Sequence, residues 1–406
     1  MTFQGAIQAH GNPAGWPEVE LRSVVRQRKE FEQPDLPLLG VSVASGVRPR
    51  TTDDGRQAAS LDLSAYKVVH PGDVIMNALG KPHGSIGVST TAGITSPAYW
   101  VLEVSGEVPR FVHYMLRSQH MVNEYQRLGK YLPPNQFDIP WETFRSVAIP
   151  LPGLDEQRRI ADFLDDQVSF LNRVMDSRER QRILVQERLV ANYDALFVGP
   201  PRPLKQVLRQ SPSYGVLVPR FVDDGGVRFI RIGNLNHLEE PDLMLNQIDA
   251  AQSLEYRRTL VKPGDVLVGV VGSIDKSALV PEDLRGANLA RAVARLVPTD
   301  ELPAELLLAW TKTSYYGVLA RQATANDTAQ PTLNMGDLKN FPIALRTDCK
   351  VSELLEKARR AKTSHGELVS ALENSLALLQ ERKRALITAA VTGEFDVSTA
   401  SGRNVA

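Results

Sequence analysis

The chain carries one short sequence twice. Val69-His70-Pro71-Gly72-Asp73-Val74 returns as Val261-Lys262-Pro263-Gly264-Asp265-Val266. Each copy precedes a helical segment that starts near Pro109 or Pro303, then a short apolar strand, and then a long helix rich in charge. The order is therefore globule, long helix, globule, long helix. This order predicts a molecule that recognises two similar targets at a fixed separation.

The composition sets broad limits on the class of protein. A length of 406 residues allows two or three domains with real cores, and the fractions of hydrophobic (43%) and charged (23%) residues are ordinary for soluble proteins. Cys349 is the only cysteine, which excludes an intrachain disulfide or a cysteine-based metal cluster. A formal net charge of zero cautions against nucleic-acid binding but does not exclude it, because a sum hides a one-sided basic face.

The sequence also bears on the compartment. Met1–Gly15 is polar and lacks the basic and apolar regions of a secretory signal, and no apolar run reaches the ~18 residues of a membrane span. Because a single cysteine suits a reducing environment, we expect a cytoplasmic protein without a membrane segment.

Each globule is expected to contain short strands broken by Gly and Pro, followed by one helix with apolar residues at helical spacing. In the first globule, about Gly15–Pro152, the expected strands are Leu38–Val43, Val68–Ile75 and Tyr99–Val104, and the helix is Arg110–Gln126. In the second, about Arg202–Thr347, the expected strands are Arg228–Ile232, Asp265–Val271 and Val293–Val297, and the helix is Glu305–Arg321.

Two long helices follow the globules. One begins at Leu154 with acidic residues in its first turn, and the other begins near Val351 with apolar residues at alternating steps of three and four. His365 falls on this second seam, where we expect a packed or register-setting polar residue. Each helix has roughly 42 residues and a length of about 60 Å. The simplest way to bury both seams is an antiparallel pair, and the alternative is that each helix forms its own intermolecular coil.

The predicted fold class is therefore α+β. Two similar mixed α/β domains are separated by two long helices that form an antiparallel coiled coil, with a pseudo-two-fold internal repeat. The expected segments are a first domain at 1–153, a first helix at 154–198, a second domain at 199–348, a second helix at 349–393 and a flexible tail at 394–406.

Four segments carry a resemblance to a known family. Ile149–Asp165 reads IPLPGLDEQRRIADFLD and Glu381–Val397 reads ERKRALITAAVTGEFDV, while Pro71–Val74 and Thr95–Tyr99 are shorter matches. In order, spacing and duplication, the chain resembles the specificity subunits of type I restriction–modification systems over nearly its whole length. The opening of the second long helix, Asp348–Val351, departs from the family pattern.

The resemblance implies a division of labour. Each globule is expected to be a target-recognition domain that reads one half of an asymmetric, bipartite site in double-stranded DNA, with the helices setting the spacing. The helices and their flanks are expected to dock two methyltransferase subunits that use S-adenosylmethionine. Restriction subunits, which hydrolyse ATP with Mg²⁺ and cut DNA, would join this core. The chain itself is expected to be neither an enzyme nor a cofactor-binding protein.

The sequence shows no active site of its own. Gly269–Ser277 resembles a phosphate-binding loop, but Asp275 stands where a Gly should precede Lys276. Leu132–Asn135 has the wrong order for an amino-methyltransferase motif, and the seven histidines lack the spacing of metal ligands. We therefore predict no catalytic and no metal-binding residue.

DNA reading needs side chains that can fork onto base edges or bind phosphates, placed on surface loops. The candidates in the first globule are Arg48, Arg50, Lys81, His83, Ser85, Lys130, Tyr131, Asn135 and Gln136. Those in the second are Tyr214, Arg220, Arg231, Asn234, Ser273, Lys276, Asn288, Arg291, Thr328 and Gln330. The candidates for docking the methyltransferase are Glu156, Gln157, Arg158, Arg382, Arg384 and Leu386, although Glu156 and Gln157 could simply cap their helix.

Two other functions stay open at this stage. A duplicated coiled-coil adaptor that binds proteins without DNA specificity would fit the neutral charge. A single-chain methyltransferase or nuclease would need the cofactor loops that the sequence lacks.

Overall fold

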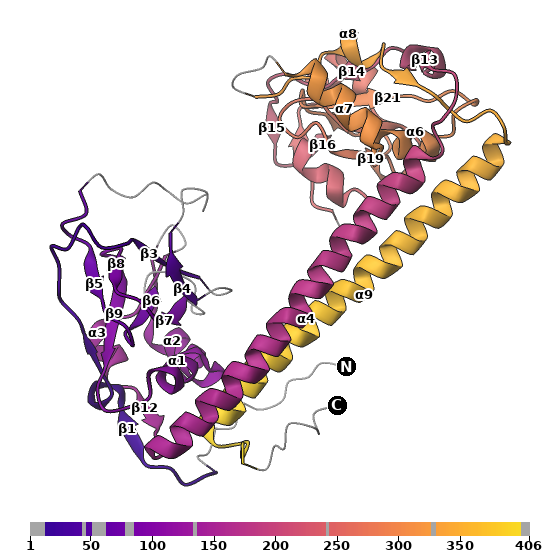
Figure 1. Ribbon diagram of the computed structural model, residues 1–406. Helices are drawn as coiled ribbons and strands as arrows, with labels where there is room; N and C mark the ends of the chain where they lie inside the picture. The colour runs from indigo at the N-terminus through magenta and orange to yellow at the C-terminus, as the bar shows by residue number, and fades with distance from the viewer. Residues whose placement is uncertain are drawn as a thin grey trace. The chain divides into compact units, whose positions relative to one another are not determined.

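The computed structural model describes residues 13–42, 46–50, 62–77, 85–132, 136–240, 243–325 and 330–398, with the side chains of residues 130–137 excepted. It forms two compact units, one of Met1–Ser177 with Asn374–Ala406 and the other of Arg178–Glu373. Each unit holds one globule and a segment of both long helices, α4 (Leu154–Asp194) and α9 (Val351–Thr392) (Figure 1). The five domain segments expected from the sequence remain a prediction.

The first globule is built on a four-stranded antiparallel sheet in the order β2-β9-β6-β7. Three short helices follow the sheet in sequence, and four two-stranded ribbons complete the globule. The sheet strands are β2 (Val25–Gln27), β9 (Tyr99–Val104), β6 (Val74–Asn77) and β7 (Ile86–Val88). The helices are α1 (Pro109–Arg117), α2 (Gln119–Leu128) and α3 (Trp141–Phe144), with the 3-10 turn η1 (Leu21–Ser23). The ribbons pair β1 (Glu18–Glu20) with β12 (Ala148–Pro150), β3 (Leu39–Ser42) with β4 (Gly46–Pro49), β5 (Lys67–Val69) with β8 (Gly93–Thr95), and β10 (Lys130–Leu132) with β11 (Gln136–Asp138).

The second globule repeats this plan with the sheet order β14-β21-β18-β19 and adds a second four-stranded sheet. The repeated strands are β14 (Ser213–Tyr214), β21 (Val293–Leu296), β18 (Val266–Gly269) and β19 (Ser277–Leu279). The added sheet contains β15 (Phe221–Val222), β17 (Gln247–Ile248), β16 (Val227–Ile230) and β20 (Asn288–Leu289), and a ribbon joins β13 (Arg202–Pro203) to β22 (Pro342–Ile343). The helices are α5 (Ala250–Glu255), α6 (Ala304–Thr311), α7 (Ser314–Ala323) and α8 (Met335–Leu338), with 3-10 turns η2 (Leu204–Val207), η3 (Ile232–His237), η4 (Arg257–Thr259) and η5 (Glu282–Leu284).

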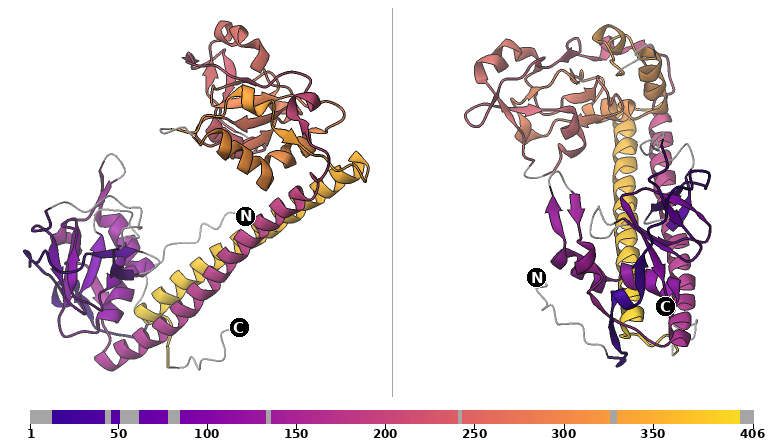
Figure 2. Two further views of the ribbon diagram at one scale, coloured as in Figure 1. Left: turned by 45° about the horizontal axis from the view of Figure 1, so that its top comes forward. Right: turned by 90° about the vertical axis from the view of Figure 1, so that its left-hand side faces the viewer.

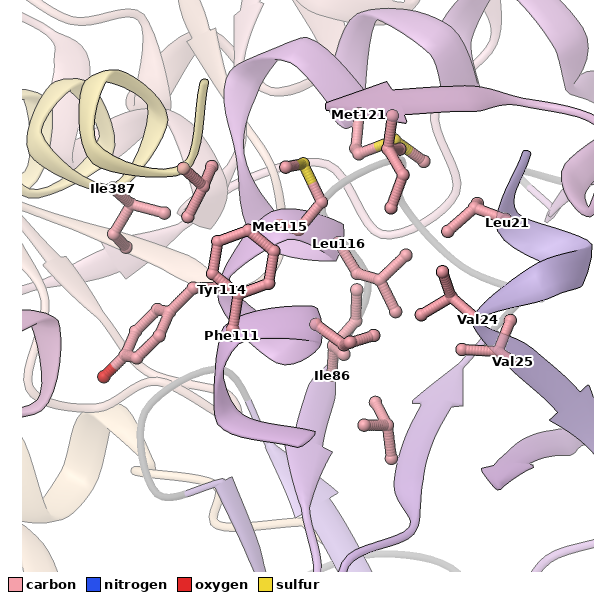
Figure 3. Packing of buried hydrophobic residues seen from close by; sticks show 14 of the residues in the cluster. Leu21, Val24, Val25, Ile86, Phe111, Tyr114, Met115, Leu116, Met121 and Ile387 are labelled. Carbon is pink, nitrogen blue, oxygen red and sulfur yellow. The ribbon is translucent and has the colours of Figure 1, made fainter. Parts of the chain in front are cut away.

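The core of the first unit forms where α1 packs between the sheet and the long helices. Figure 3 shows Phe111, Met115 and Leu116 of α1 facing Leu21, Val24 and Val25 from the start of the globule, with Ile387 of α9 beside them. All of these side chains are buried. Burial of such side chains contributes about 1.5–3 kcal/mol each, so the globule and its helix segments form one cooperative body.

Inside each unit the long helices run antiparallel. In the first unit the last turns of α9 lie beside the first turns of α4, as Figures 1 and 2 show, and Lys383 Nζ donates to Asn172 Oδ1 at 3.0 Å. In the second unit His365 Nε2 lies 2.9 Å from Gln186 Oε1, and burial lowers the pKa of this half-buried histidine. The expected α+β fold with two similar domains and an antiparallel helix pair is confirmed.

The expected strand Val68–Ile75 is wrong, because it is two strands, β5 and β6, separated by a turn. Gly72 takes a positive φ of 93°, a conformation that glycine adopts at little cost. The Asp73 carboxylate holds the turn, since it accepts hydrogen bonds from the His70 amide at 2.8 Å and from Arg28 Nε at 2.8 Å. The repeated Pro-Gly-Asp segment is therefore a structural turn that starts a central strand.

Both single helices expected after the sheets are also wrong in detail, because each is divided in two. Ser118 separates α1 from α2 and its side chain accepts the Met121 amide. Thr313 separates α6 from α7 and accepts the Tyr316 amide in the same way. A Ser or Thr cap starts a new helix where the periodic apolar pattern alone indicates continuation. The first long helix likewise ends at Asp194, four residues before the expected boundary.

Candidate nucleic-acid interface

Several loops of the second globule leave the sheet at the same end of its strands. This end of the strands is called the sheet edge below. Tyr214, at the end of β14, pairs with Ala294 near the start of β21. Gly269, at the end of β18, pairs with Val293 at the start of β21, and β19 begins beside Val268. The loops after Tyr214, after Gly269 and before Val293 therefore lie together at this edge.

Further backbone contacts bring two more segments to the same edge. Val271 pairs with Thr332, and the Gly272 amide donates to Pro331 O at 2.9 Å. On the other side, the Ala290 amide donates to Ile230 O at 3.0 Å, which places the end of β16 beside the loop before β21. The predicted residues that the structure brings together here are Tyr214, Arg231, Ser273, Lys276, Arg291 and Gln330.

The arginines of this edge are held by their neighbours without being buried. Arg231 stacks over the Phe221 ring, with its guanidinium carbon 5.9 Å from the ring centroid, and it donates to Asn246. Arg220 is exposed and lies 3.7 Å from Glu255, a surface contact that leaves its charge available. The side chain of Asn234 accepts the Arg231 amide at 2.8 Å, so its oxygen is used to start η3.

Asn288 must be removed from the DNA-reading set. Its side chain is fully buried, and its Oδ1 accepts from Thr259 Oγ1 at 2.6 Å and from the Leu289 amide at 2.8 Å. Its Nδ2 donates to Ser253 O and Oγ. Because every one of these groups is already bonded inside the globule, this amide holds β20 against α5 and η4 and cannot reach a base.

The first globule has the corresponding edge. Asn77, at the end of β6, pairs with Tyr99 at the start of β9, and its amide donates to Ser85 O at 3.0 Å. Ser85 therefore lies at this edge, whereas Lys81 and His83 fall outside the described residues. The β3–β4 hairpin packs on β7 next to it, which carries the exposed Arg48 and the half-buried Arg50 close to the edge.

The remaining candidates follow the second short helix of each globule. Lys130, Tyr131 and Gln136 lie on the β10–β11 ribbon, whose backbone is described but whose side chains are not. Asn135 and Thr328 fall outside the described residues. These residues therefore stay predictions.

The docking candidates at the helix ends divide into buried and accessible ones. Gln157 is fully buried, accepts the Val108 amide at 3.0 Å and donates to Glu107 Oε2 and Pro152 O at 2.6 and 2.8 Å. It fixes the loop before α1 to the start of α4, so the prediction that it contacts a partner is wrong. Arg158, Arg382 and Arg384 are exposed, while Glu156 and Leu386 are half-buried.

Comparison with known proteins identifies the architecture. No family model matches the chain. The EcoBI type I restriction enzyme specificity subunit of Escherichia coli is 26% identical over 291 residues, which cover 62% of this chain and 59% of that protein. A chain from a structure on complex assembly and conformational transition of a type I restriction–modification system has a TM-score of 0.69, 18% identity and coverage of 94% and 99% of the two chains. The HsdS subunit from Thermoanaerobacter tengcongensis has a TM-score of 0.51, 19% identity and coverage of 94% and 98%.

The chain has the fold of a type I specificity subunit. The resemblance found in the sequence is thereby confirmed, with the match spanning about three fifths of the length of the curated relative. Because the two globules are duplicates, the two sheet edges described above lie at equivalent positions of their globules.

One group of residues at the edge of the second globule was missed from the sequence. Leu217 and Val218 follow β14 and are among the exposed large hydrophobic side chains of the chain. The signal was the run Val216-Leu217-Val218-Pro219, which is too short for a helix and does not alternate as a half-buried strand does.

The described residues offer neither a metal-binding cluster nor a membrane-spanning helix. They contain no group of three or more His, Cys, Asp or Glu side chains placed to hold a metal ion. None of the helices in the described part of the chain is long and apolar enough to span a bilayer.

Proposed function

We propose that this chain is the non-catalytic DNA-specificity subunit of a type I restriction–modification complex. Each globule reads one half of an asymmetric, bipartite site in double-stranded DNA. The observation that carries the proposal is the duplicated sheet whose loops gather at one edge in each globule. Because the two edges carry different side chains, the two half-sites have different sequences.

The side chains at these edges suit base reading. Arg231 and Arg291 can fork onto the O6 and N7 atoms of guanine, and Gln330 can do the same on adenine. Tyr214, Ser273 and Lys276 suit phosphate contacts that fix the register of the protein on DNA. In the first globule, Arg48, Arg50 and Ser85 take the corresponding roles, together with the undescribed side chains named above.

The long helices set the spacing between the half-sites and dock two methyltransferase subunits. The accessible charges of Arg158, Arg382 and Arg384 at the helix ends support a polar docking surface. S-adenosylmethionine is bound by these partners, and ATP and Mg²⁺ by restriction subunits that join the complex. The assembly works in the cytoplasm, where its DNA lies.

The first experiment is a genome-wide map of methylated adenines in the source cell, with and without this gene. We expect deletion to abolish methylation at one split, asymmetric motif. Unchanged methylation would contradict the proposal and favour the duplicated adaptor.

A substitution then links the map to the second globule. Complementation with Arg231→Ala or Arg291→Ala should relax or abolish recognition in one half of the motif only, because one bidentate contact discriminates by about 1–3 kcal/mol. Arg285→Ala is the matched control, since Arg285 is an exposed arginine of the same globule that pairs with Glu282 away from the edge loops. Loss of both halves, or of neither, would contradict the assignment of one half-site to each globule.

A further inference from the structure

A short apolar tip protrudes at the sheet edge of the second globule. It consists of Leu217 and Val218, whose exposed fractions are 52% and 73%, followed by Pro219. The tip lies between β14 and β15, beside the loops that carry the proposed DNA-reading residues. Two aliphatic side chains exposed next to each other on a polar edge call for a partner that offers an apolar group.

The backbone holds the first side of the tip firmly. The Val216 amide donates to Leu289 O at 2.7 Å, and the Arg291 amide donates to Val216 O at 3.0 Å. Gly215 approaches the Leu289 carbonyl so closely that a Cβ atom there would lie 1.7 Å from its oxygen. Only glycine fits this contact, so the tip starts from a fixed position against β20.

The second side is fixed by Gln252, a buried residue of α5. Its Nε2 donates to Val218 O at 2.9 Å, and its Oε1 accepts the Arg220 amide at 2.7 Å. The Gln252 amide is itself held by Asp249 Oδ1 at 2.7 Å. The globule thus uses a buried side chain to hold the two aliphatic residues outward, an arrangement that pre-organises a binding contact.

The surroundings of the tip indicate what it meets. Arg220 follows the tip after Pro219. The Arg291 amide is bonded to Val216, the residue before the tip, and Arg231 stacks on the ring of Phe221. Glu255 offsets part of the charge of Arg220 at 3.7 Å. An apolar centre among three arginines is complementary to the major groove of DNA, where phosphates flank the base edges.

The floor of the major groove offers one apolar group, the 5-methyl group of thymine. We propose that the Leu217-Val218 tip contacts the 5-methyl group of a thymine in the half-site read by the second globule. The inference rests on the proposed function and adds a base to it: arginines and Gln330 read hydrogen-bonding edges, while the tip reads a methyl group.

The test removes the methyl group from the DNA and the aliphatic group from the protein in turn. The full chain, purified with its methyltransferase partners, is titrated with a duplex that carries the mapped motif. Each thymine is replaced singly by deoxyuridine, which differs only in the missing methyl group. For the wild type we expect binding about four-fold weaker at one position, the value of one buried methyl group. Leu217→Ser or Val218→Ser should bind thymine and uracil equally at that position.

Val318→Ser is the matched control, because Val318 is an exposed aliphatic residue of α7, outside the tip. This variant should keep the preference for thymine. If no thymine shows the preference in the wild type, or if the tip variants retain it, the methyl contact is overturned. A third outcome is that the tip variants lose affinity equally for every duplex and that a mismatch in the motif restores this affinity. The tip would then be a wedge between base pairs, which also overturns the methyl contact.

Failure of the proposed function would give a different binding result from failure of the tip contact. A wild-type complex that binds the mapped motif no better than an unrelated duplex would contradict DNA specificity itself. A wild type that distinguishes the two duplexes but ignores the thymine methyl groups would contradict the tip alone.

Discussion

The two globules rest on the long helices through equivalent positions of opposite charge. In the first unit, Arg110, the second residue of α1, donates through Nη2 to Asp162, the ninth residue of α4, at 2.7 Å. In the second unit, Glu305, the second residue of α6, accepts from Nη2 of Arg359, the ninth residue of α9, at 2.6 Å. The contact has the same place in both units, but acid and base are exchanged.

A second contact repeats without this exchange. The Gln119 amide at the start of α2 donates to Thr388 Oγ1 of α9 at 2.8 Å. The Ser314 amide at the start of α7 donates to Asp194 Oδ1 of α4 at 2.9 Å. In each unit, therefore, the long helix that arrives at the globule binds the first amide of the second short helix, where a donor lacks an intrahelical partner.

The comparison separates what the duplication keeps from what it varies. Backbone contacts and caps recur, because the same fold needs them in both units. Charges differ, and the difference has a consequence for assembly: α1 placed on α9 would set Arg110 against Arg359, and α6 placed on α4 would set Glu305 against Asp162. Such like-charge contacts are unfavourable, so each globule is matched to its own helix.

The largest expected effect concerns the repeated turn, where the two copies recruit different arginines. Asp265 pairs with Arg295, and the side chains are 4% and 7% exposed; Asp73 pairs with Arg28, whose side chain is 20% exposed. Asp265→Ala should cost about 3–5 kcal/mol, because it leaves a buried charge without its partner. Asp73→Ala should cost less, about 1–3 kcal/mol, since Glu30 and Glu103 remain 3.9 and 3.7 Å from Arg28.

Hydrogen exchange of the β18 and β6 amides measures the two effects separately within the full chain. Asp265→Asn is the control, because it removes the charge but can still accept the Lys262 amide that the native carboxylate accepts at 2.6 Å. It should fall between the wild type and Asp265→Ala. Equal losses in β18 and β6 for the two alanine variants would contradict the different burial of the arginines.

A second difference lies at the fifth position of the docking helix, which is His113 in α1 and Leu308 in α6. Burial, with a smaller effect from Arg117, lowers the pKa of His113 from 6.5 to about 3. Below pH 6.5, His113 therefore becomes protonated in the unfolded chain but stays neutral in the folded unit. Stability is lost as the pH falls from about 6.5 towards 3, at about 1.4 kcal/mol per pH unit.

His113→Leu copies the residue of the second unit and should remove this loss. Urea unfolding at pH 7.5 and 4.5 is the measurement, and the variant should gain about 2–3 kcal/mol over the wild type between the two values. His365→Leu is the control, since burial lowers the pKa of His365 less than that of His113, and this variant should give a smaller change. A gain for His113→Leu that is the same at both pH values would mean that packing, and not protonation, sets the difference.

These comparisons also show which parts of the sequence could be read directly. The strand Tyr99–Val104 was predicted with its observed bounds, because all its residues except Glu103 are apolar and turn residues flank it. The break at Ser118 was missed because the apolar spacing continues across it. The repeat itself was visible, since the duplicated turn needs the same residues for the same hydrogen bonds.

Site residues were harder to predict because the same residue type occurs both in the core and on the surface. Asn288 and Asn234 look alike in sequence, yet one is enclosed by Thr259 and Ser253 and the other starts a surface turn. Gln157 looked like a surface helix residue, although it is buried against the loop before α1. Leu217 and Val218 are aliphatic residues of a type that is usually buried, yet the fold exposes both. Burial depends on contacts distant in sequence, and a single sequence does not specify those contacts.

The smallest expected effect tests the exchanged charges directly. Arg110→Glu would face Asp162 and Asp165 with a like charge and loosen α1, at a cost below about 1 kcal/mol because the pair is half exposed. Adding Asp162→Arg should restore most of the loss, as should high salt, which screens such contacts. In the second unit, Glu305→Arg should loosen α6 and Arg359→Glu should restore it. Hydrogen exchange of α1 and α6 measures each change in its own unit. If the double variants are as weak as the single ones, the contacts are not coupled, and the exchange of charge is a neutral drift of the two copies. If both double variants recover the protection of the wild type, either polarity suffices within a unit. The opposite signs in the two units then serve to stop each globule from docking on the helix of the other during folding.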